Sequence, residues 1–218
     1  MTTGATAAVE AWPHLYRPGD GVAMLALHGT GGSEEDAMAL AAAISPHAAI
    51  IAPRGRVVEG GMQRWFRRRS EGLFDVADVH ARADELAIFL RDAVEHYGIA
   101  RQVMIATGFS NGANMALALG ALHPDTVDRV LAFSGMYPLG DEDVPGPLTT
   151  TKVLLLNGSD DPMAPAASVT RLEAQLTGRG AEVDRRTRSG GHGVTSDEVR
   201  LAGEWLRALE TSHQPKVR

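Results

Sequence analysis

The sequence predicts an α/β protein with a mostly parallel central sheet and helices on both faces. Short β-rich runs alternate with helical patterns along the chain, which is typical of that class. Several of the runs are almost continuously apolar, as strands covered on both faces are. No internal repeat or low-complexity stretch interrupts the alternation. With 218 residues and one such pattern, we expect a single domain over residues 1–218.

Each expected element follows from local pattern. The expected strands are Val22–Leu27, Ala49–Ala52, Val103–Phe109, Val130–Phe133, Val153–Leu156 and Glu182–Thr187. Apolar residues recur at helical spacing over Asp78–Tyr97, Pro165–Leu176 and Ser196–Leu209, and a further helix is expected from Asn111. Two long irregular pieces, Arg54–Phe74 and Met136–Thr151, follow strands. In an open α/β sheet such loops surround the ligand crevice.

The composition excludes several function classes. The formal net charge is −6, so the chain lacks the broad positive field that binding to a phosphate backbone needs, and nucleic acid is not expected as a partner. The chain contains no cysteine, which excludes disulfides and a cysteine nucleophile. The first twenty residues lack the basic start and apolar run of a signal peptide, and no later run is long enough to span a bilayer. We therefore expect a cytoplasmic protein without membrane insertion.

A candidate nucleophile lies between an expected strand and an expected helix. The segment Gly108-Phe109-Ser110-Asn111-Gly112 matches G-x-S-x-G, and this strand–turn–helix context gives the match its meaning. The turn is so tight that bulky side chains at Gly108 or Gly112 would collide with neighbouring backbone. The pattern predicts Ser110 as the nucleophile of a serine hydrolase with the α/β-hydrolase fold.

The glycine-rich segment Leu27–Gly32 directly follows an expected strand and predicts an oxyanion hole. Such a loop can turn its backbone N–H groups toward a developing negative oxygen. We expect the N–H of Thr30 to be one donor, and the N–H of Asn111, the residue after the nucleophile, to be the other. His28 ends a buried strand and precedes Ser110, so we expect it to hold the loop in place. The glycines match no phosphate-binding pattern.

The acid and the base are expected on loops after the last two strands. Asp160 and Asp161 follow one of them, and His192 follows the other among glycines, which completes the chain order Ser, Asp, His of this fold. The base activates the serine hydroxyl, and the acid orients the base. The residue pattern alone does not separate Asp160 from Asp161, since either could cap the next helix. The competing histidines lie on helices, at element ends or near the termini: His14, His28, His47, His80, His96, His123 and His213.

These motifs resemble the small carboxylesterase/phospholipase family of α/β-hydrolases, relatives of acyl-protein thioesterases and dienelactone hydrolases. The resemblance is closest to the bacterial carboxylesterase subgroup associated with the response to hydroquinones and aromatic compounds. The matching pieces span most of the chain: LHGTGG at Leu27–Gly32, APRG at Ala52–Gly55, RWFRR at Arg64–Arg68, EGLFD at Glu71–Asp75, GFSNGANMA at Gly108–Ala116, NGSDDPMAP at Asn157–Pro165 and GGHG at Gly190–Gly193.

The resemblance implies further properties. It selects Asp161 as the acid, implies a small protein without a separate cap domain, and leaves a homodimer open because the family includes monomers and dimers. The sequence departs from the family at Asn157, where relatives often carry histidine. Dienelactone hydrolases typically use cysteine where this chain has Ser110, which weakens a dienelactone substrate without excluding other lactones.

The segment Met62–Arg69 mixes aromatic residues with four arginines, and it carries the expected substrate contacts. We expect Trp65 and Phe66 to line the acyl or aryl site, with Met136 and Met163 as further wall residues, because flexible thioethers suit a tolerant apolar pocket. One arginine could meet an anionic or hydroxylated substrate. The alternatives are that the arginines pair with nearby carboxylates (Glu71, Asp75 and Asp78) and that the apolar residues are core.

Together these features predict a serine carboxylesterase that hydrolyses small esters, with short acyl or aryl groups, through an acyl-enzyme. No metal or organic cofactor is required by this chemistry. Thioesterase or lactonase activity would use the same residues. A catalytically silent binding protein is disfavoured because such a protein would usually lack one of Ser110, Asp161 and His192, and all three are present.

Overall fold

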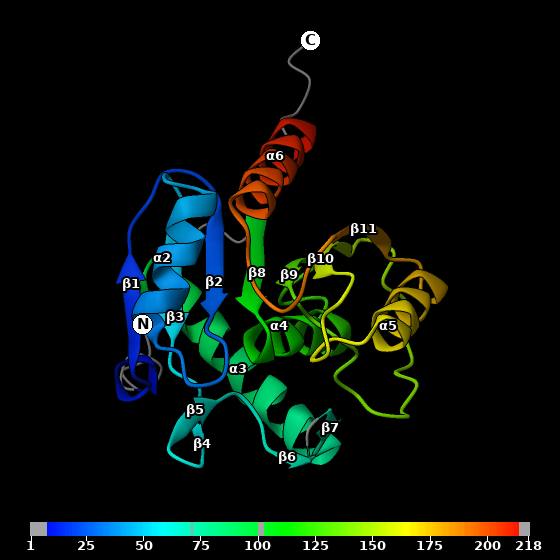
Figure 1. Cartoon of the computed structure of the whole chain (residues 1–218). Coiled ribbons are helices and arrows are strands. Elements are labelled where there is room, and N and C mark those ends of the chain that lie inside the picture. The colour runs from blue at the N-terminus through cyan, green and yellow to red at the C-terminus, as the bar shows by residue number, and fades with distance from the viewer. Residues whose placement is uncertain (1–7, 71, 100–102, 214–218) are drawn as a thin grey trace.

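A seven-stranded sheet forms the centre of the protein (Figure 1). The computed structural model describes residues 8–70, 72–99 and 103–213. The strands, in spatial order, are β1 (His14–Arg17), β3 (Ala49–Pro53), β2 (Ala23–Leu27), β8 (Met104–Phe109), β9 (Arg129–Phe133), β10 (Lys152–Gly158) and β11 (Glu182–Arg188). Edge strand β1 runs antiparallel to β3, and every other neighbouring pair is parallel. The predicted α/β class is confirmed.

Within the described residues, five long helices lie on the two faces of the sheet (Figure 1). They are α2 (Glu34–Ile44), α3 (Val76–His96), α4 (Asn111–Leu122), α5 (Ala166–Gly178) and α6 (Ser196–His213). Apolar residues of α2 and α6 pack with one face of the strands, and those of α3, α4 and α5 pack with the other. The central strands are buried along almost their whole length. This explains why their sequences read as continuous apolar runs.

The six predicted strands lie within two residues of their observed ends. Strand β1 was not predicted, because all four of its residues are only half-buried and give no apolar run. Helix α2 was also missed, although Ser33 and Asp36 form a capping box at its start. Pro165 stands at the N-cap of α5 instead of inside the helix.

The segment predicted as irregular, Arg54–Phe74, holds two small hairpins. They are β4 (Val57–Glu59) with β5 (Met62–Arg64), and β6 (Arg68–Ser70) with β7 (Leu73–Phe74). Gly60 and Gly61 form the first turn with positive φ values of 58° and 79°, which a two-residue hairpin turn of this kind requires. Both hairpins lie beyond the carboxyl ends of the strands (Figure 1). The other predicted loop, Met136–Thr151, is irregular as expected.

Within the described chain no helix is long and apolar enough to cross a membrane. In the same residues no group of three or more His, Cys, Asp or Glu side chains could hold a metal ion.

Candidate active site

Ser110 sits on a strained turn between β8 and α4. Its backbone has φ 54° and ψ −116°, a conformation that non-glycine residues rarely adopt and that is typical of functional sites. Its N–H donates to the carbonyl of Phe133 over 2.9 Å. A Cβ on Gly108 would lie 2.4 Å from the Gly112 carbonyl carbon, and one on Gly112 would lie 2.2 Å from the Leu27 oxygen. Only glycine at both positions permits this turn.

Asp161 and His192 meet at the ends of two neighbouring parallel strands, β10 and β11. His192 Nδ1 lies 2.8 Å from Asp161 Oδ2, and the Asp161 side chain is fully buried. The other carboxylate oxygen accepts the N–H groups of Met163 (2.8 Å) and Ala164 (3.1 Å). The imidazole also packs against Phe109, the residue before Ser110, with ring centroids 4.9 Å apart. The geometry therefore brings the histidine to the turn that carries the serine.

Asp160, the alternative acid, faces elsewhere. Its carboxylate is exposed and accepts the Ser159 hydroxyl (2.9 Å) and the Gly190 N–H (3.4 Å). It contacts the His192 loop through that backbone N–H and makes no hydrogen bond to the imidazole within the described residues. Of the two aspartates, the structure pairs Asp161 with His192.

His28 is buried in the loop after β2. Its Nε2 accepts the N–H of Gly55 over 2.9 Å, so Nδ1 carries the proton and donates to the Gly29 carbonyl over 2.7 Å. Burial lowers the pKa of the imidazole below its usual range. A neutral ring with both nitrogens bonded to backbone fits the predicted role of holding the loop.

A pocket of about 30 Å³ contains Ser110. Its lining residues are Thr30, Arg64, Gly72, Phe74, Ser110, Asn111, Asn114, Met136 and Met163. Four of the predicted contact residues are thus present: Thr30, Asn111, Met136 and Met163. Asn114 was missed, although it lies one helical turn after Ser110 on α4 and helical spacing could have found it. Gly72 and Phe74 were missed because their place depends on how the β6–β7 hairpin folds back.

The predicted oxyanion donors are held by the hairpins and by α4. Gly31 N–H donates to the Gln63 carbonyl over 2.8 Å, which ties the loop of Thr30 to β5. Among the residues described, the N–H of Thr30 has no protein acceptor. Asn111 begins α4, where the first N–H groups lack intrahelical partners. Both N–H groups are therefore suited to donate hydrogen bonds to an oxygen of a bound molecule.

Trp65 and Phe66 do not line this pocket, which corrects the expectation from sequence. Trp65 is 2% exposed; its indole N–H donates to the His28 carbonyl (2.9 Å) and its backbone N–H to Asn111 Oδ1 (2.7 Å). Phe66 is fully buried and packs edge-on against Phe74 at 5.0 Å. The chain folds back over the core here, so both rings support the pocket from behind.

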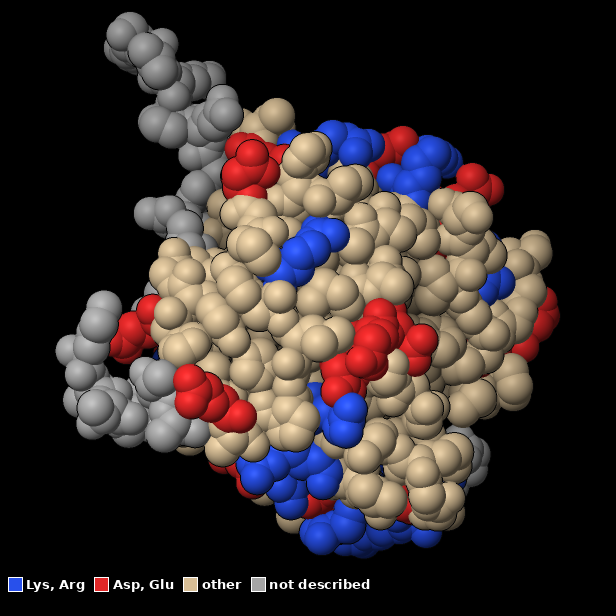
Figure 2. Space-filling model, turned by 90° about the vertical axis from the view of Figure 1, so that its left-hand side faces the viewer, with Lys and Arg blue, Asp and Glu red and all other residues tan. Residues whose placement is uncertain are grey.

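Three of the four arginines of this segment bind carboxylates of the described chain. Basic side chains gather at the lower end of the face seen in Figure 2, the end at which Figure 1 places the two hairpins. Arg67 pairs with Asp75 (3.5 Å) and Asp78 (3.3 Å), and Arg68 with Glu59 at 2.8 Å. Glu71 lies outside the described residues. These pairs match the alternative in which arginines pin the loop.

Arg64 differs from the other arginines because it also lines the pocket. It is 4% exposed, pairs with Glu59 at 3.3 Å, and donates to the Thr30 hydroxyl over 3.1 Å. It therefore connects the hairpin to the loop of the predicted oxyanion hole.

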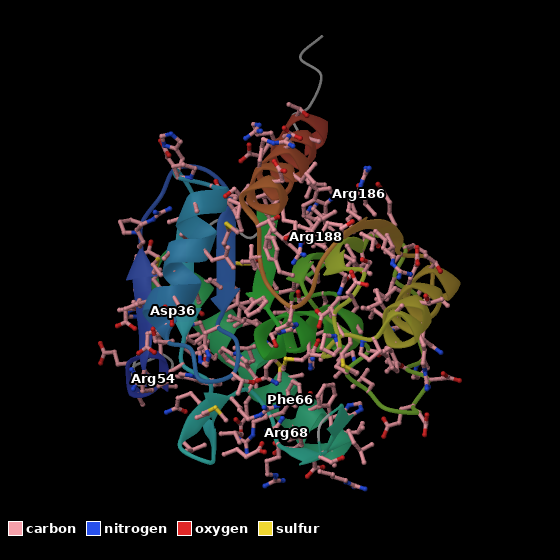
Figure 3. The ribbon with its side chains drawn as sticks, in the orientation of Figure 1. Asp36, Arg54, Phe66, Arg68, Arg186 and Arg188 are labelled. Atoms are coloured by element: carbon pink, nitrogen blue, oxygen red, sulfur yellow. The ribbon has the colours of Figure 1, made fainter. Side chains whose placement is uncertain are left out.

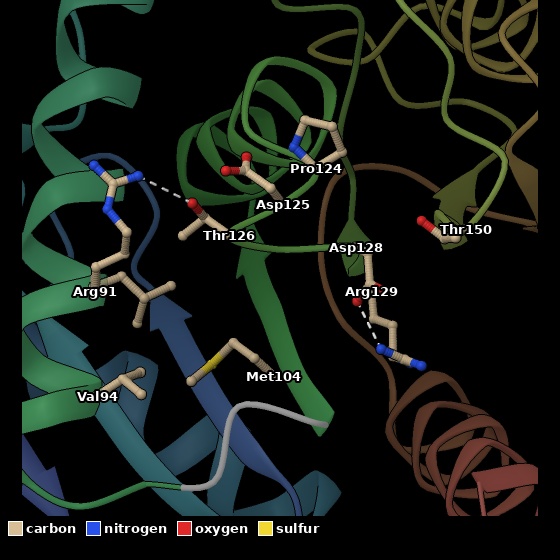
Figure 4. A pocket seen from close by; sticks show the side chains of 10 residues that line it. Arg91, Val94, Met104, Pro124, Asp125, Thr126, Asp128, Arg129 and Thr150 are labelled. Carbon is tan, nitrogen blue, oxygen red and sulfur yellow. Dashed lines mark hydrogen bonds and ion pairs between the residues drawn. The ribbon is translucent and has the colours of Figure 1, made fainter.

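A larger cavity of about 440 Å³ lies at the amino ends of β8 and β9 (Figure 4). It is lined by Leu90, Arg91, Val94, Met104, Pro124, Asp125, Thr126, Asp128, Arg129 and Thr150. None of these lining residues is a serine or a histidine, and the cavity opens at the end of the sheet away from Ser110. The larger cavity therefore contains neither the candidate nucleophile nor a candidate base.

The strand order, the strained serine after β8, and the paired carboxylate and histidine after β10 and β11 define an α/β-hydrolase fold. The model of the family described as Phospholipase/Carboxylesterase matches residues 21–210. The chain belongs to this family, as its motifs indicated, and is a carboxylic ester hydrolase by class.

Individual relatives agree with this assignment. "Putative hydrolase MhqD" of Bacillus subtilis (strain 168) is 36% identical over 196 residues, which cover 89% of this chain and 97% of the relative. Among solved structures, the Bacillus cereus carboxylesterase has a TM-score of 0.86 and 32% identity, with 95% of this chain and 99% of that chain covered. A Mesorhizobium loti carboxylesterase has a TM-score of 0.82 and 29% identity, with coverages of 90% and 98%.

Proposed function

We propose that the protein is a serine carboxylesterase that hydrolyses small esters through an acyl-enzyme, with Ser110 as nucleophile, His192 as base and Asp161 as acid. One observation carries the proposal. A buried carboxylate binds His192 at 2.8 Å, and that imidazole packs beside the strained turn of Ser110. A serine hydroxyl is a weak nucleophile until a positioned base accepts its proton.

The tautomer of His192 follows from its partner. An ionised carboxylate only accepts hydrogen bonds, so Nδ1 carries the proton that Asp161 Oδ2 receives. Nε2 then holds the lone pair that takes the proton of Ser110 Oγ as that oxygen attacks the ester carbonyl. Asp161 stabilises the imidazolium that forms. The fully buried carboxylate makes this interaction stronger than it would be in water.

The developing oxyanion would accept hydrogen bonds from the N–H groups of Thr30 and Asn111. As the tetrahedral intermediate collapses, the bond to the leaving oxygen breaks and the imidazolium gives its proton to the alcohol. Water then attacks the acyl-enzyme while His192 accepts its proton. As the bond from Ser110 Oγ to the acyl carbon breaks, His192 gives that proton to Ser110 Oγ and the acid product leaves. Each half-reaction returns His192 to its neutral form, and only the second restores the proton of Ser110.

The pocket supports small acyl groups. The pocket beside Ser110 is small, and Met136, Met163 and Phe74 form the apolar part of its wall. A methylene contributes about 0.8 kcal/mol only while it is being buried. We expect kcat/KM to peak at a short acyl chain and then fall. A steady climb to long-chain esters would contradict a small acyl site and favour a substrate class like that of relatives that act on lipids or acylated proteins.

Covalent labelling tests the proposal. A fluorophosphonate probe should modify Ser110, located by mass spectrometry of proteolytic peptides, and Ser110→Ala should remain unlabelled. Ser45→Ala is the control, because Ser45 lies at the C-cap of α2, at the amino end of the strands and away from Ser110. It should label like the wild type. Absence of adduct at Ser110 in folded protein would refute the nucleophile and favour a silent binding protein.

Activity measurements then separate the ester subclasses. A panel of 4-nitrophenyl esters graded by acyl length, with an acyl thioester and a lactone, reports the preferred carbonyl compound. The proposal expects the short-chain ester to have the highest kcat/KM. A thioester or lactone preferred at equal acyl size would redefine the substrate while leaving the Ser110 chemistry in place.

A further inference from the structure

The loop that carries His192 has few side chains that could fix its conformation. Residues 189–193 read Ser-Gly-Gly-His-Gly, and Gly190 has a φ of 112°. Glycines lose more conformational freedom on ordering than any other residue, so such a loop does not fix a catalytic side chain unaided. Its backbone carbonyls are the groups by which it can be held.

Arg188, the last residue of β11, binds three of those carbonyls. Its Nη1 donates to the Ser189 oxygen (3.2 Å), and its Nη2 donates to the oxygens of Gly191 (3.0 Å) and Gly193 (2.9 Å). The last two residues flank His192 on both sides. A guanidinium suits this task because it presents several donors in one rigid plane.

The guanidinium is itself held from the opposite side. Its Nε donates over 2.9 Å to Glu198, whose side chain is only 5% exposed. The same Glu198 oxygen accepts the backbone N–H and the hydroxyl of Thr195, and the Thr195 hydroxyl in turn accepts the Glu198 N–H, as in a capping box. Arg188 therefore links the loop of His192 to the first turn of α6.

Other contacts also hold Gly190 and Gly193, whereas Arg188 alone among the described residues binds the Gly191 carbonyl. The Ser134 hydroxyl donates to the Gly193 carbonyl (3.2 Å), and Asp160 N–H donates to the Gly190 carbonyl (3.0 Å). The hydrogen bond to Asp161 restrains one edge of the His192 ring, and none of the contacts of Ser134 and Asp160 reaches the imidazole. Asp161 and Phe109 contact the ring itself, and Arg188 binds the backbone that carries the ring.

We propose that Arg188 is a positioning residue for His192: it holds the loop of residues 189–193 by its carbonyls and so aims the imidazole at Ser110. The inference rests on the proposed function. Misplacement of a reacting group by about 1 Å can cost on the order of 10²-fold in rate. Loss of Arg188 would alter the geometry of the transition state and not the substrate pocket. It should therefore lower kcat and leave KM unchanged.

The test compares two arginines of the same strand (Figure 3). Arg186 lies two residues earlier, is 62% exposed, and pairs with Asp184 on the surface. Arg188→Gln and Arg186→Gln change the net charge equally. On 4-nitrophenyl acetate we expect kcat of Arg188→Gln to fall on the order of 10²-fold with KM near the wild-type value, whereas Arg186→Gln keeps both. Equal kcat values for the two folded variants would overturn the proposal.

Two further variants guard against a merely structural effect. Arg188→Gln leaves a buried Glu198 carboxylate unpaired, which can destabilise the fold; Arg188→Gln with Glu198→Gln removes that charge and is expected to show the same loss in kcat. Arg188→Ala should recover part of its kcat when ethylguanidinium is added, since a small guanidinium can reoccupy the site. Folding is checked by circular dichroism, and failure of the added cation to restore kcat in folded Arg188→Ala would overturn the proposal.

Ser110→Ala in the same assay separates the two levels of inference. If Ser110→Ala is inert and Arg188→Gln is fully active, the proposed function stands and the positioning role fails. If Ser110→Ala retains the wild-type rate, the proposed function itself fails.

Discussion

The loop after β2 and the loop after β11 each place a histidine among glycines at the carboxyl end of a strand, yet the two side chains have opposite surroundings. Both ring nitrogens of His28 bind backbone groups of Gly29 and Gly55. His192 has one nitrogen on Asp161, its side chain is 18% exposed, and no described residue bonds to its Nε2.

The difference shows what makes a histidine available for proton transfer. Protonation of His28 would break its hydrogen bond from Gly55 N–H and place a charge in the core, and both cost free energy. Protonation of His192 would place a positive charge against a carboxylate and leave every hydrogen bond intact. Position after a strand therefore does not distinguish the two histidines, whereas the partners of their ring nitrogens do.

The largest expected effect separates the two loops by activity. Ser110→Ala and His192→Ala should each lower kcat on the order of 10⁶-fold, as in another serine hydrolase whose triad residues act as a unit. His28→Gln should retain most of the activity of the folded protein. Hydrolysis of 4-nitrophenyl acetate measures all three. A tenth of wild-type activity in Ser110→Ala would break the assignment.

The next comparison is between the two adjacent aspartates. Asp161→Asn keeps an oxygen for the N–H groups of Met163 and Ala164 but loses the acceptor for His192, and kcat should fall on the order of 10⁴-fold. Asp160→Asn should lose far less, because its contacts are to Ser159 and the Gly190 backbone. Similar losses in two well-folded variants would leave Asp161 without a special role.

A smaller effect concerns stability in the loop after β2. His28→Ala leaves the buried N–H of Gly55 without its acceptor, which should lower the free energy of unfolding by about 1–3 kcal/mol before any cavity term. His47→Ala is the control, since its side chain is 83% exposed and should change the free energy by no more than about 0.5 kcal/mol. Urea unfolding curves measure both. Equal midpoints would mean that His28 does not hold the loop.

The smallest effect is the pH dependence of stability. Burial lowers the pKa of His28 from its ordinary value of 6.5, so the unfolded chain binds a proton here at a higher pH than the folded protein does. The contribution of His28 to the free energy of unfolding should be complete above about pH 6.5 and decline as the pH falls toward the lowered value. Between neutral and mildly acidic pH, the free energy of unfolding should therefore fall more steeply for the wild type than for His28→Gln. Parallel curves would contradict the lowered pKa.

Several elements were predictable because their signals are local. The buried strands show as apolar runs, and the glycines around Ser110 mark a turn that no larger side chain permits. The half-buried edge strand β1 was not predictable, because its pairing with β3 across the intervening chain determines it. The expectation for Trp65 and Phe66 was wrong for a related reason. The local sequence around an aromatic residue in a loop does not show whether its ring faces a ligand or the core.

The sequence by itself determined the α/β class, the family, the order Ser, Asp, His and the place of each after a strand, because glycine requirements and apolar periodicity act between near neighbours in the chain. The residue pattern left Asp160 and Asp161 open, and the family resemblance chose Asp161. Only the tertiary structure decided which backbone groups bind the two nitrogens of His28 and which side chains surround Ser110. Those outcomes depend on distances of a few ångströms between segments far apart in sequence. A hydrogen bond needs its donor and acceptor within about 3.2 Å of each other, and a local pattern of residue types does not determine that distance.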